Sequence, residues 1–469
     1  MTFANGLHSL NGGGDELTAK DSRRAGTGLF RSKGGRVFAG MPARVHLGHM
    51  KRRKRALLVM MVGASVLVAC GERVVGTPAR YLYVWAGDED GKQSDFMSVF
   101  DVNPSSAQFG QVISTTPVGM SNSMPHHLEY QLPAEGEFLF GNAHHHETVF
   151  LFDTRDSTHP TVARTLPSVP PLRYPHDFIR LPNGNLLVGY LRSNGASPLA
   201  GDTTMPGGHG GIAEFTPQGE LVRWRSAADS TSTSTVPIRP YAFALLPALD
   251  RFVVTSALMM EDTSASVVQI WRMSDLSLLR TLTVPEAIDS SGKPIKGSNG
   301  LPFEPRVLPD GSVFFNSYYC GFYRLTDVAN NPTITPVYGI DMPDAEKACG
   351  VPLLIGKYWI MAIGRLNSLV TLDLSDPTHP REVQRLYADS VFRPHWLAYD
   401  EGGRRVVVGA ENGGESRMLM ADFDPATGKL AWNEKLRGKD GTRGLSFTMG
   451  KWPHGESGAA YGHAAVFRK

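Results

Sequence analysis

One short phrase recurs along this chain and restricts the folds open to it. A proline followed by a larger residue begins an apolar stretch, which leads through a turn into a second apolar stretch. Successive copies are spaced by 42 to 65 residues and stand at Pro125-His126, Pro175-His176, Pro240-Tyr241, Pro305-Arg306, Pro352-Leu353, Pro394-His395 and Pro453-His454. Such a period, with several short strands per unit, is typical of propeller blades that carry loop insertions. The sequence therefore predicts an all-β, seven-bladed β-propeller.

Short alternating apolar segments fill the chain from Tyr81 onward, and a helical period is almost absent. Turn dipeptides such as Asn183-Gly184 and Asp310-Gly311 separate them, and these are strong hairpin signals. A second echo joins residues 153–160 and 373–380, which both begin with Asp and end in Thr-His-Pro. We expect the segment from Trp452 to pair with strands near Tyr81, because this closes the ring and removes its free edges.

The N-terminal segment has the features of a targeting signal. The basic run 51–55 precedes an apolar stretch 56–69, as in a secretory signal. That stretch ends in Leu67-Val68-Ala69-Cys70, which resembles the bacterial lipobox and implies an acylated Cys70. An ordinary signal peptide or an uncleaved anchor is the alternative.

These features divide the chain into four parts. Residues 1–49 are interpreted as a disordered segment translated from an upstream start codon, because Met50 directly precedes the basic run. Residues 50–70 form the lipoprotein signal, 71–79 a linker and 80–469 the propeller. We expect a lipid-anchored protein of the bacterial cell envelope, facing the periplasm or the cell surface, with membrane contact only through the anchor.

Charge and cysteine content restrict the partners and the cross-links that the protein can have. Residues 71–469 carry 35 Lys and Arg against 42 Asp and Glu, which argues against a nucleic-acid partner. With Cys70 assigned to lipid, Cys320 and Cys349 remain. In an oxidising compartment they could form a disulfide; two free thiols or soft metal ligands stay open.

Histidines occupy four of the seven repeated positions: His126, His176, His395 and His454. Equivalent positions at the start of innermost strands surround the axis of a propeller, so these imidazoles should converge. Sites rich in imidazole suit Cu, Fe, Zn or Ni. The alternative is four polar side chains lining a hydrated channel.

The other histidines and nearby acids carry weaker expectations. His127 could add a ligand or an orienting hydrogen bond, and His144-His145-His146 could supply a ligand or form a polar hairpin tip. His209 lies in a long loop on the same face, His159 and His379 are expected to be structural, and His463 is undecided. Metal-bound imidazoles are commonly oriented by carboxylates; the nearest in sequence are Glu129, Asp177 and Glu304. No catalytic residue is assigned, and the chain has no G-x-S-x-G, Walker, dinucleotide, H-E-x-x-H or C-x-x-C motif.

Several stretches resemble the selenium-binding protein family, which includes methanethiol oxidases. They are residues 96–104 followed by Gly110-Gln111-Val112-Ile113, then Pro125-His126-His127, Pro175-His176, residues 372–377 and His454. The match covers most of residues 80–460 in order. This chain departs from the family at Leu366-Asn367, where the family has a histidine, and at residues 128–131, where the family is rich in cysteine.

The resemblance implies a seven-bladed propeller that binds copper through His126, His127, His176 and His454, with His395 a substitute for the missing family histidine. It also implies oxidation of methanethiol by O2 to formaldehyde, hydrogen sulfide and hydrogen peroxide. The family's cysteines, through which selenium would bind, are absent from this chain. Our leading hypothesis is therefore a copper oxidase acting on a small thiol and O2. The alternatives are a four-histidine iron oxygenase, like the carotenoid oxygenases, and a non-enzymatic propeller that binds a metal or a partner.

Overall fold

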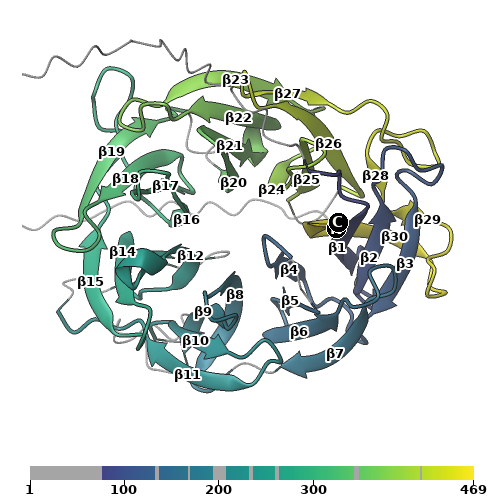
Figure 1. Cartoon of the computed structure of the whole chain (residues 1–469), viewed down its shortest axis with the longest axis horizontal. Helices are drawn as coiled ribbons and strands as arrows, with labels where there is room; N and C mark the ends of the chain where they lie inside the picture. Colours follow the sequence, from purple (N-terminus) through teal and green to yellow (C-terminus); the bar gives the residue numbers. More distant parts are fainter. Residues whose placement is uncertain are drawn as a thin grey trace, which may run out of the picture. The chain divides into compact units, whose positions relative to one another are not determined.

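A computed structural model describes residues 76–132, 137–166, 169–193, 208–231, 236–258, 263–342, 348–411 and 415–469. These residues form seven small antiparallel sheets arranged in a ring, which is a seven-bladed β-propeller (Figure 1). This confirms the predicted fold. The proposed signal, the lipobox and Cys70 lie outside the described residues. Within the described residues, no helix is long and apolar enough to cross a bilayer.

The sheets follow one another along the chain. The closing sheet contains β29 (Thr448–Met449), β30 (Gly458–Arg468), β1 (Tyr81–Asp88), β2 (Phe96–Asp101) and β3 (Val112–Pro117). Three sheets contain β4 (Pro125–Leu128), β5 (Phe138–Ala143), β6 (Thr148–Asp153) and β7 (Thr161–Leu166); β8 (Leu172–Arg180), β9 (Leu186–Ser193), β10 (Gly211–Phe215) and β11 (Leu221–Ser226); and β12 (Pro240–Leu246), β13 (Arg251–Ser256), β14 (Val267–Arg272) and β15 (Leu278–Thr283).

The remaining sheets complete the ring. They contain β16 (Pro302–Val307), β17 (Val313–Ser317), β18 (Gly321–Thr326) and β19 (Thr333–Gly339); β20 (Cys349–Ile355), β21 (Tyr358–Ile363), β22 (Ser368–Asp373) and β23 (Arg381–Tyr387); and β24 (Pro394–Asp400), β25 (Arg405–Ala410), β26 (Arg417–Asp424) and β27 (Lys429–Trp432), with β28 (Leu445–Ser446) beside β26. Within the described residues, the 3-10 turns η1 (Pro247–Leu249) and η3 (Gly364–Leu366) lie in hairpins.

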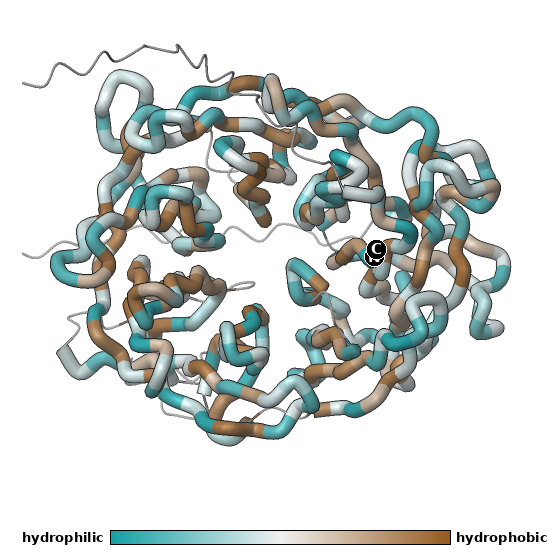
Figure 2. Tube along the Cα trace, in the orientation of Figure 1, coloured by the Kyte–Doolittle hydropathy of each residue, from teal (hydrophilic) through white to brown (hydrophobic). Residues whose placement is uncertain are grey.

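Strand β30 closes the ring as expected, because it pairs with β1 along its length. The innermost strands of all seven sheets, β30, β4, β8, β12, β16, β20 and β24, contact one another in succession around the axis. Apolar residues follow the strands, and hydrophilic residues gather at the turns (Figure 2). The core therefore lies between the faces of neighbouring sheets, while the innermost strands decide what lies at the axis.

Each innermost strand carries the same irregularity. In β4, His126 and His127 together lie opposite the single residue Asn142, which is a β-bulge. The same two-to-one pairing occurs in β8, β12, β16, β20 and β24. In β30 the ladder shifts by one residue between Gly462 and the residue after His463. The bulge is thus a property of the fold, repeated in all seven sheets.

The repeated Pro-X phrase locates this bulge in four sheets and misses it in three. In β16 and β20 the bulge comes before Pro305 and Pro352, and Pro453 precedes β30 altogether. Proline has no N–H to donate to the ladder, so within a sheet it is confined to places such as a bulge. Here it occurs on either flank of the bulge. Proline therefore indicates that a bulge is near, but the residue after the repeated proline is not the bulge residue in these three sheets.

Cys320 and Cys349 form a disulfide with 5.3 Å between their Cα atoms. Cys320 lies in the turn between β17 and β18, and Cys349 begins β20 of the next sheet. Of the three possibilities that the sequence left open, the structure has the cross-link between neighbouring sheets, which removes both sulfurs from the candidate metal ligands.

A buried ion pair holds the first described residues against the last complete sheet. Asp400 and Arg405, on the β24–β25 hairpin, pair with side chains 1% and 4% exposed. Both Asp400 oxygens accept the Ala79 N–H, while Arg405 donates to the carbonyls of Ala79 and Val102. The pair thus binds both ends of β1–β2 and helps to fix the ring closure.

We expect Asp400→Ala to lower the free energy of unfolding by about 3–5 kcal/mol, because it leaves the buried Arg405 without a counter-charge. Glu220→Ala is the matched control: its pair with Arg164 is exposed, so the loss should stay below about 1 kcal/mol. Urea unfolding of both variants measures the difference. Equal losses would contradict a closure role for the buried pair.

Candidate metal centre

The seven bulges set pairs of residues at the inner end of each sheet. The first residues of the pairs are His126, His176, Tyr241, Phe303, Gly350, His395 and Gly462, and the second are His127, Asp177, Ala242, Glu304, Val351, Trp396 and His463. In a regular strand successive side chains point to opposite faces. The rings of His126 and His127 nevertheless lie only 4.6 Å apart between centroids, so the bulge gives one strand two neighbouring imidazoles.

Three fully buried histidines form the centre of the site. The ring nitrogens of His126, His127 and His176 include one atom each that all lie within 4.8 Å of one another. The Nε2 atoms of His126 and His176 are 3.3 Å apart. Two nitrogens bound tetrahedrally at roughly 2.0–2.1 Å from one ion would be separated by about 3.3 Å. The spacing therefore fits a shared metal ion.

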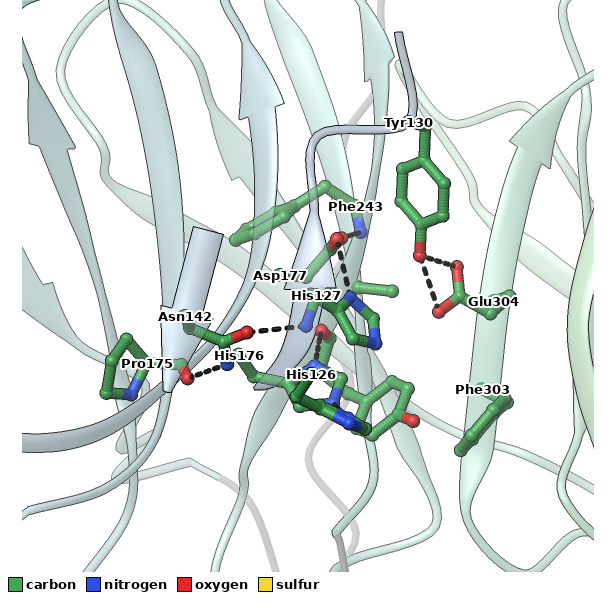
Figure 3. Close-up of polar contacts among 12 residues, drawn as sticks. His126, His127, Tyr130, Asn142, Pro175, His176, Asp177, Phe243, Phe303 and Glu304 are labelled. Atoms are coloured by element: carbon green, nitrogen blue, oxygen red, sulfur yellow. Dashed lines mark hydrogen bonds and ion pairs between the residues drawn. The ribbon is translucent and has the colours of Figure 1, made fainter. Parts of the chain in front are cut away.

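Hydrogen bonds orient the imidazoles from behind. His176 Nδ1 lies 2.9 Å from the Tyr241 carbonyl, and His463 Nδ1 lies 2.7 Å from the His126 carbonyl. Since a carbonyl can only accept, each Nδ1 carries the proton and each Nε2 keeps its lone pair free for a metal. His127 Nδ1 lies 3.5 Å from Asp177 Oδ1 (Figure 3), the carboxylate–histidine arrangement common behind metal ligands.

Burial keeps the cluster neutral. It lowers the pKa of His176 to about 3 and holds the pKa values of His126, His127 and His463 well below their ordinary value, with neighbouring imidazoles adding to the shift. Neutral imidazole is the form that binds metals. Burial, and then the nearby Glu304 carboxylate, raises the pKa of Asp177.

Several polar atoms of the cluster have no hydrogen bond within the described residues. They are His126 Nδ1, both ring nitrogens of His127 and Asp177 Oδ1, although His127 Nδ1 and Asp177 Oδ1 face each other at 3.5 Å. Leaving a buried polar group unpaired costs about 1–3 kcal/mol. A cation that accepts the lone pair of His127 Nε2 would satisfy that atom, and the residues present therefore fit a metal ion.

Two more histidines border this group. The ring of His395 lies 5.1 Å from that of His463 and 6.5 Å from that of His126, and it is partly exposed. His144, in the β5–β6 turn, is buried 5.7 Å from His126, and burial lowers its pKa to about 4. Of the three consecutive histidines, only His144 turns inward; His145 and His146 are exposed and contact the carbonyls of Asn122 and Ser121.

His454 does not lie with the other predicted ligands. Its Nδ1 is 2.6 Å from the Thr115 hydroxyl on β3, the outermost strand of the closing sheet, and its Nε2 contacts Glu456. The expectation that His454 faces the axis is wrong because the innermost strand of this sheet begins at Gly458, after it. His463, inside that strand, occupies the corresponding bulge and replaces it.

The remaining predicted residues have other neighbours. Glu129 pairs with Arg180 at 2.7 Å and so serves the packing of two sheets. His209 Nδ1 accepts the Ile238 N–H at 3.0 Å. The exposed His379 contacts Asp376, and the exposed His159 contacts Thr158, which agrees with structural roles. Glu304 faces Tyr130 and not an imidazole.

The comparisons with known proteins identify the fold and no family. Neither the known family models nor the sequences of curated proteins match this chain. A hypothetical selenium-binding protein from Sulfolobus tokodaii has a similar structure, with a TM-score of 0.63 and 15% identity over 84% of this chain and 94% of that one. A putative 6-phosphogluconolactonase from Bacteroides fragilis (0.53, 12%, 77% and 95%) and a periplasmic gluconolactonase from Pseudomonas aeruginosa (0.53, 17%, 75% and 94%) are also similar. Enzymes thus occur on this fold, and the activity must be argued from the site.

We expect the purified propeller to bind about one transition-metal ion at the three-histidine group. A His126→Ala/His176→Ala double variant should lose more than about 100-fold in affinity, because removing ligands costs more than removing the groups that orient them. His454→Ala should bind like the wild type, since that imidazole contacts Thr115. Titration with Cu²⁺ and Zn²⁺ followed by elemental analysis measures this, and weakened binding in His454→Ala would contradict the assignment.

Proposed function

We propose that the protein is a histidine-ligated copper oxidase that acts on a small thiol. The supporting observation is the group of three buried, neutral imidazoles, each with one ring nitrogen within 4.8 Å of the others. Imidazole binds copper well, and soft sulfur favours its reduced state. When bound there, copper would supply one-electron redox chemistry and a position for sulfur. One structural neighbour is described as a hypothetical selenium-binding protein, and the family resemblance of the sequence points in the same direction.

The chain's own residues shape the site for a small apolar substrate. The ring of Tyr241 lies 3.9 Å from that of His176, and the ring of Phe303 lies 4.3 Å from that of Tyr241. Two neighbouring positions of the seven around the axis are therefore aromatic and adjoin the imidazoles. An alkyl group would pack against these rings while its sulfur faces the histidines, which excludes water from one side of the substrate.

Gly350 lets His395 approach the backbone of β20 closely. A Cβ at this position would lie 3.2 Å from His395 Nδ1 and 3.1 Å from the His395 carbonyl. The bulge of β20 thus has no side chain at its first position, and the partly exposed His395 packs against it. We infer that His395 completes the ligand set with His463.

The proposed reaction takes methanethiol, O2 and water to formaldehyde, hydrogen sulfide and hydrogen peroxide. We expect the copper-loaded protein to form the three products in equal amounts. His463→Ala should lower the rate by at least about 100-fold, because it removes an imidazole from the ring; His379→Ala, on an exposed turn, should leave the rate unchanged. Oxygen uptake with separate assays for each product checks this.

The same experiment distinguishes the alternatives. Iron in place of copper in the protein as isolated, with no sulfide released from thiols, would favour the iron oxygenase. A tightly bound metal with no O2 uptake for any small thiol would indicate a metal-binding propeller without oxidase activity. Either outcome would overturn the copper oxidase.

A further inference from the structure

A stacked pair of aromatic rings, Trp396 and Tyr130, lies against the imidazole of His127. Trp396, the second bulge residue of β24, is fully buried, and its ring meets that of His127 edge-on at 5.0 Å. Tyr130, just after β4, stacks on Trp396 with centroids 4.9 Å apart and planes within 3°. Trp396 Nε1 donates to the Ala465 carbonyl, which fixes the indole. The two rings form a continuous contact that leads away from the cluster.

Tyr130 has a built-in acceptor for its proton. Its hydroxyl donates to the Glu304 carboxylate, with both oxygens at 3.0 Å (Figure 3). Arg306 donates to the same carboxylate at 3.0 Å, and its guanidinium lies 4.7 Å from the Tyr130 ring centroid. Glu304 is fully buried, and burial raises its pKa, which makes its carboxylate a better base. A hydrogen bond of this length is within reach for proton transfer.

The far side of Tyr130 faces a cavity. A cavity of about 730 Å³ is lined by Tyr130 and Arg306 and by the carboxyl ends of β20, β24 and β30. The imidazoles of β4, β24 and β30 lie nearer the amino ends or middles of the same strands. Tyr130 is partly exposed, so it lies between the histidine cluster and a space large enough for a small organic molecule.

We propose that Tyr130 is a redox-active residue at a second reaction site, where it oxidises small phenols or thiols by one electron at the expense of hydrogen peroxide. The proposal rests on the metal site of the proposed function, whose reaction also supplies the peroxide. Trp396 is the contact through which the electron from Tyr130 reaches the metal. The cavity holds the reductant.

The step balances in electrons and protons. Tyr130 gives one electron through Trp396 to the metal centre and its phenolic proton to Glu304, and becomes a neutral phenoxyl radical. The reductant in the cavity returns one hydrogen atom to the Tyr130 oxygen and leaves as a radical, while Glu304 releases its proton to solvent. Two such cycles supply the two electrons and two protons that convert one hydrogen peroxide into two waters.

Electron paramagnetic resonance tests the relay directly. Copper-loaded wild-type protein is mixed with hydrogen peroxide and frozen at once; we expect a tyrosyl radical whose hyperfine splitting collapses when ring-deuterated tyrosine is incorporated. Tyr130→Phe should lose this signal and Trp396→Phe should weaken it. Tyr399→Phe is the matched control, because Tyr399 lines the same cavity but packs against Phe423, and it should keep the signal. Oxidation of 2,6-dimethoxyphenol should follow the radical across the variants.

The outcomes separate the relay from the metal site. Copper content and the Cu²⁺ signal are recorded on every sample before peroxide is added. Wild-type protein that binds no copper would overturn the proposed function and the relay together. Bound copper with no tyrosyl radical, or a radical of equal yield in Tyr130→Phe or in copper-free protein, would overturn the relay alone.

Discussion

The bulge in each innermost strand is the constraint on which the rest of the structure depends. It places the clustered histidines, and the residue opposite each bulge also joins neighbouring sheets. Asn142, opposite the bulge of β4, donates to the Pro175 carbonyl at 2.7 Å, and Thr255 and Asn316 donate to carbonyls of the next sheets in the same way. Where this residue is glycine, the backbones approach directly: a Cβ at Gly409 would lie 2.4 Å from the His463 carbonyl. The same bulges therefore pack neighbouring sheets against one another and place the histidines at the axis.

This coupling explains why a polar cluster survives at the axis. Six imidazoles are brought together at a cost, because burial removes them from water and several ring nitrogens stay unpaired. The hydrogen bonds of His176 and His463 to carbonyls across the sheet boundary return part of that cost. They also fix which nitrogen faces inward. A bound ion would offset the rest of this free-energy cost. The cluster can therefore form without a metal, and the unpaired ring nitrogens still favour binding one.

The fold could be predicted from the sequence because its repeat follows from local chemistry: turn dipeptides, alternating strands and prolines beside six of the seven bulges. Of the four histidines that the repeat places at the axis, three lie there in the structure: His126, His176 and His395. His454 does not, because the last sheet is assembled from both chain ends, and its innermost strand carries no proline to mark the bulge. His463 stands after Gly462 and could have been found only by aligning the C-terminal strand with β4 in spatial register. The inward turn of His144 depends on packing against His126 and Tyr174, and sequence alone could not distinguish it from its two neighbours.

The ring is also unequal around the axis, and this inequality gives the site a direction. Histidines come from β4, β8, β24 and β30, aromatic rings from β12 and β16, and β20 contributes only Gly350. The second bulge positions repeat the division, with His127 and His463 on one side and the Glu304 carboxylate on the other. Because Trp396 belongs to this second layer, it contacts the imidazoles and Tyr130 at once. One repeated backbone irregularity thus creates two layers of side chains. Histidines of both layers form the cluster, and Trp396 of the second layer lies between His127 and Tyr130.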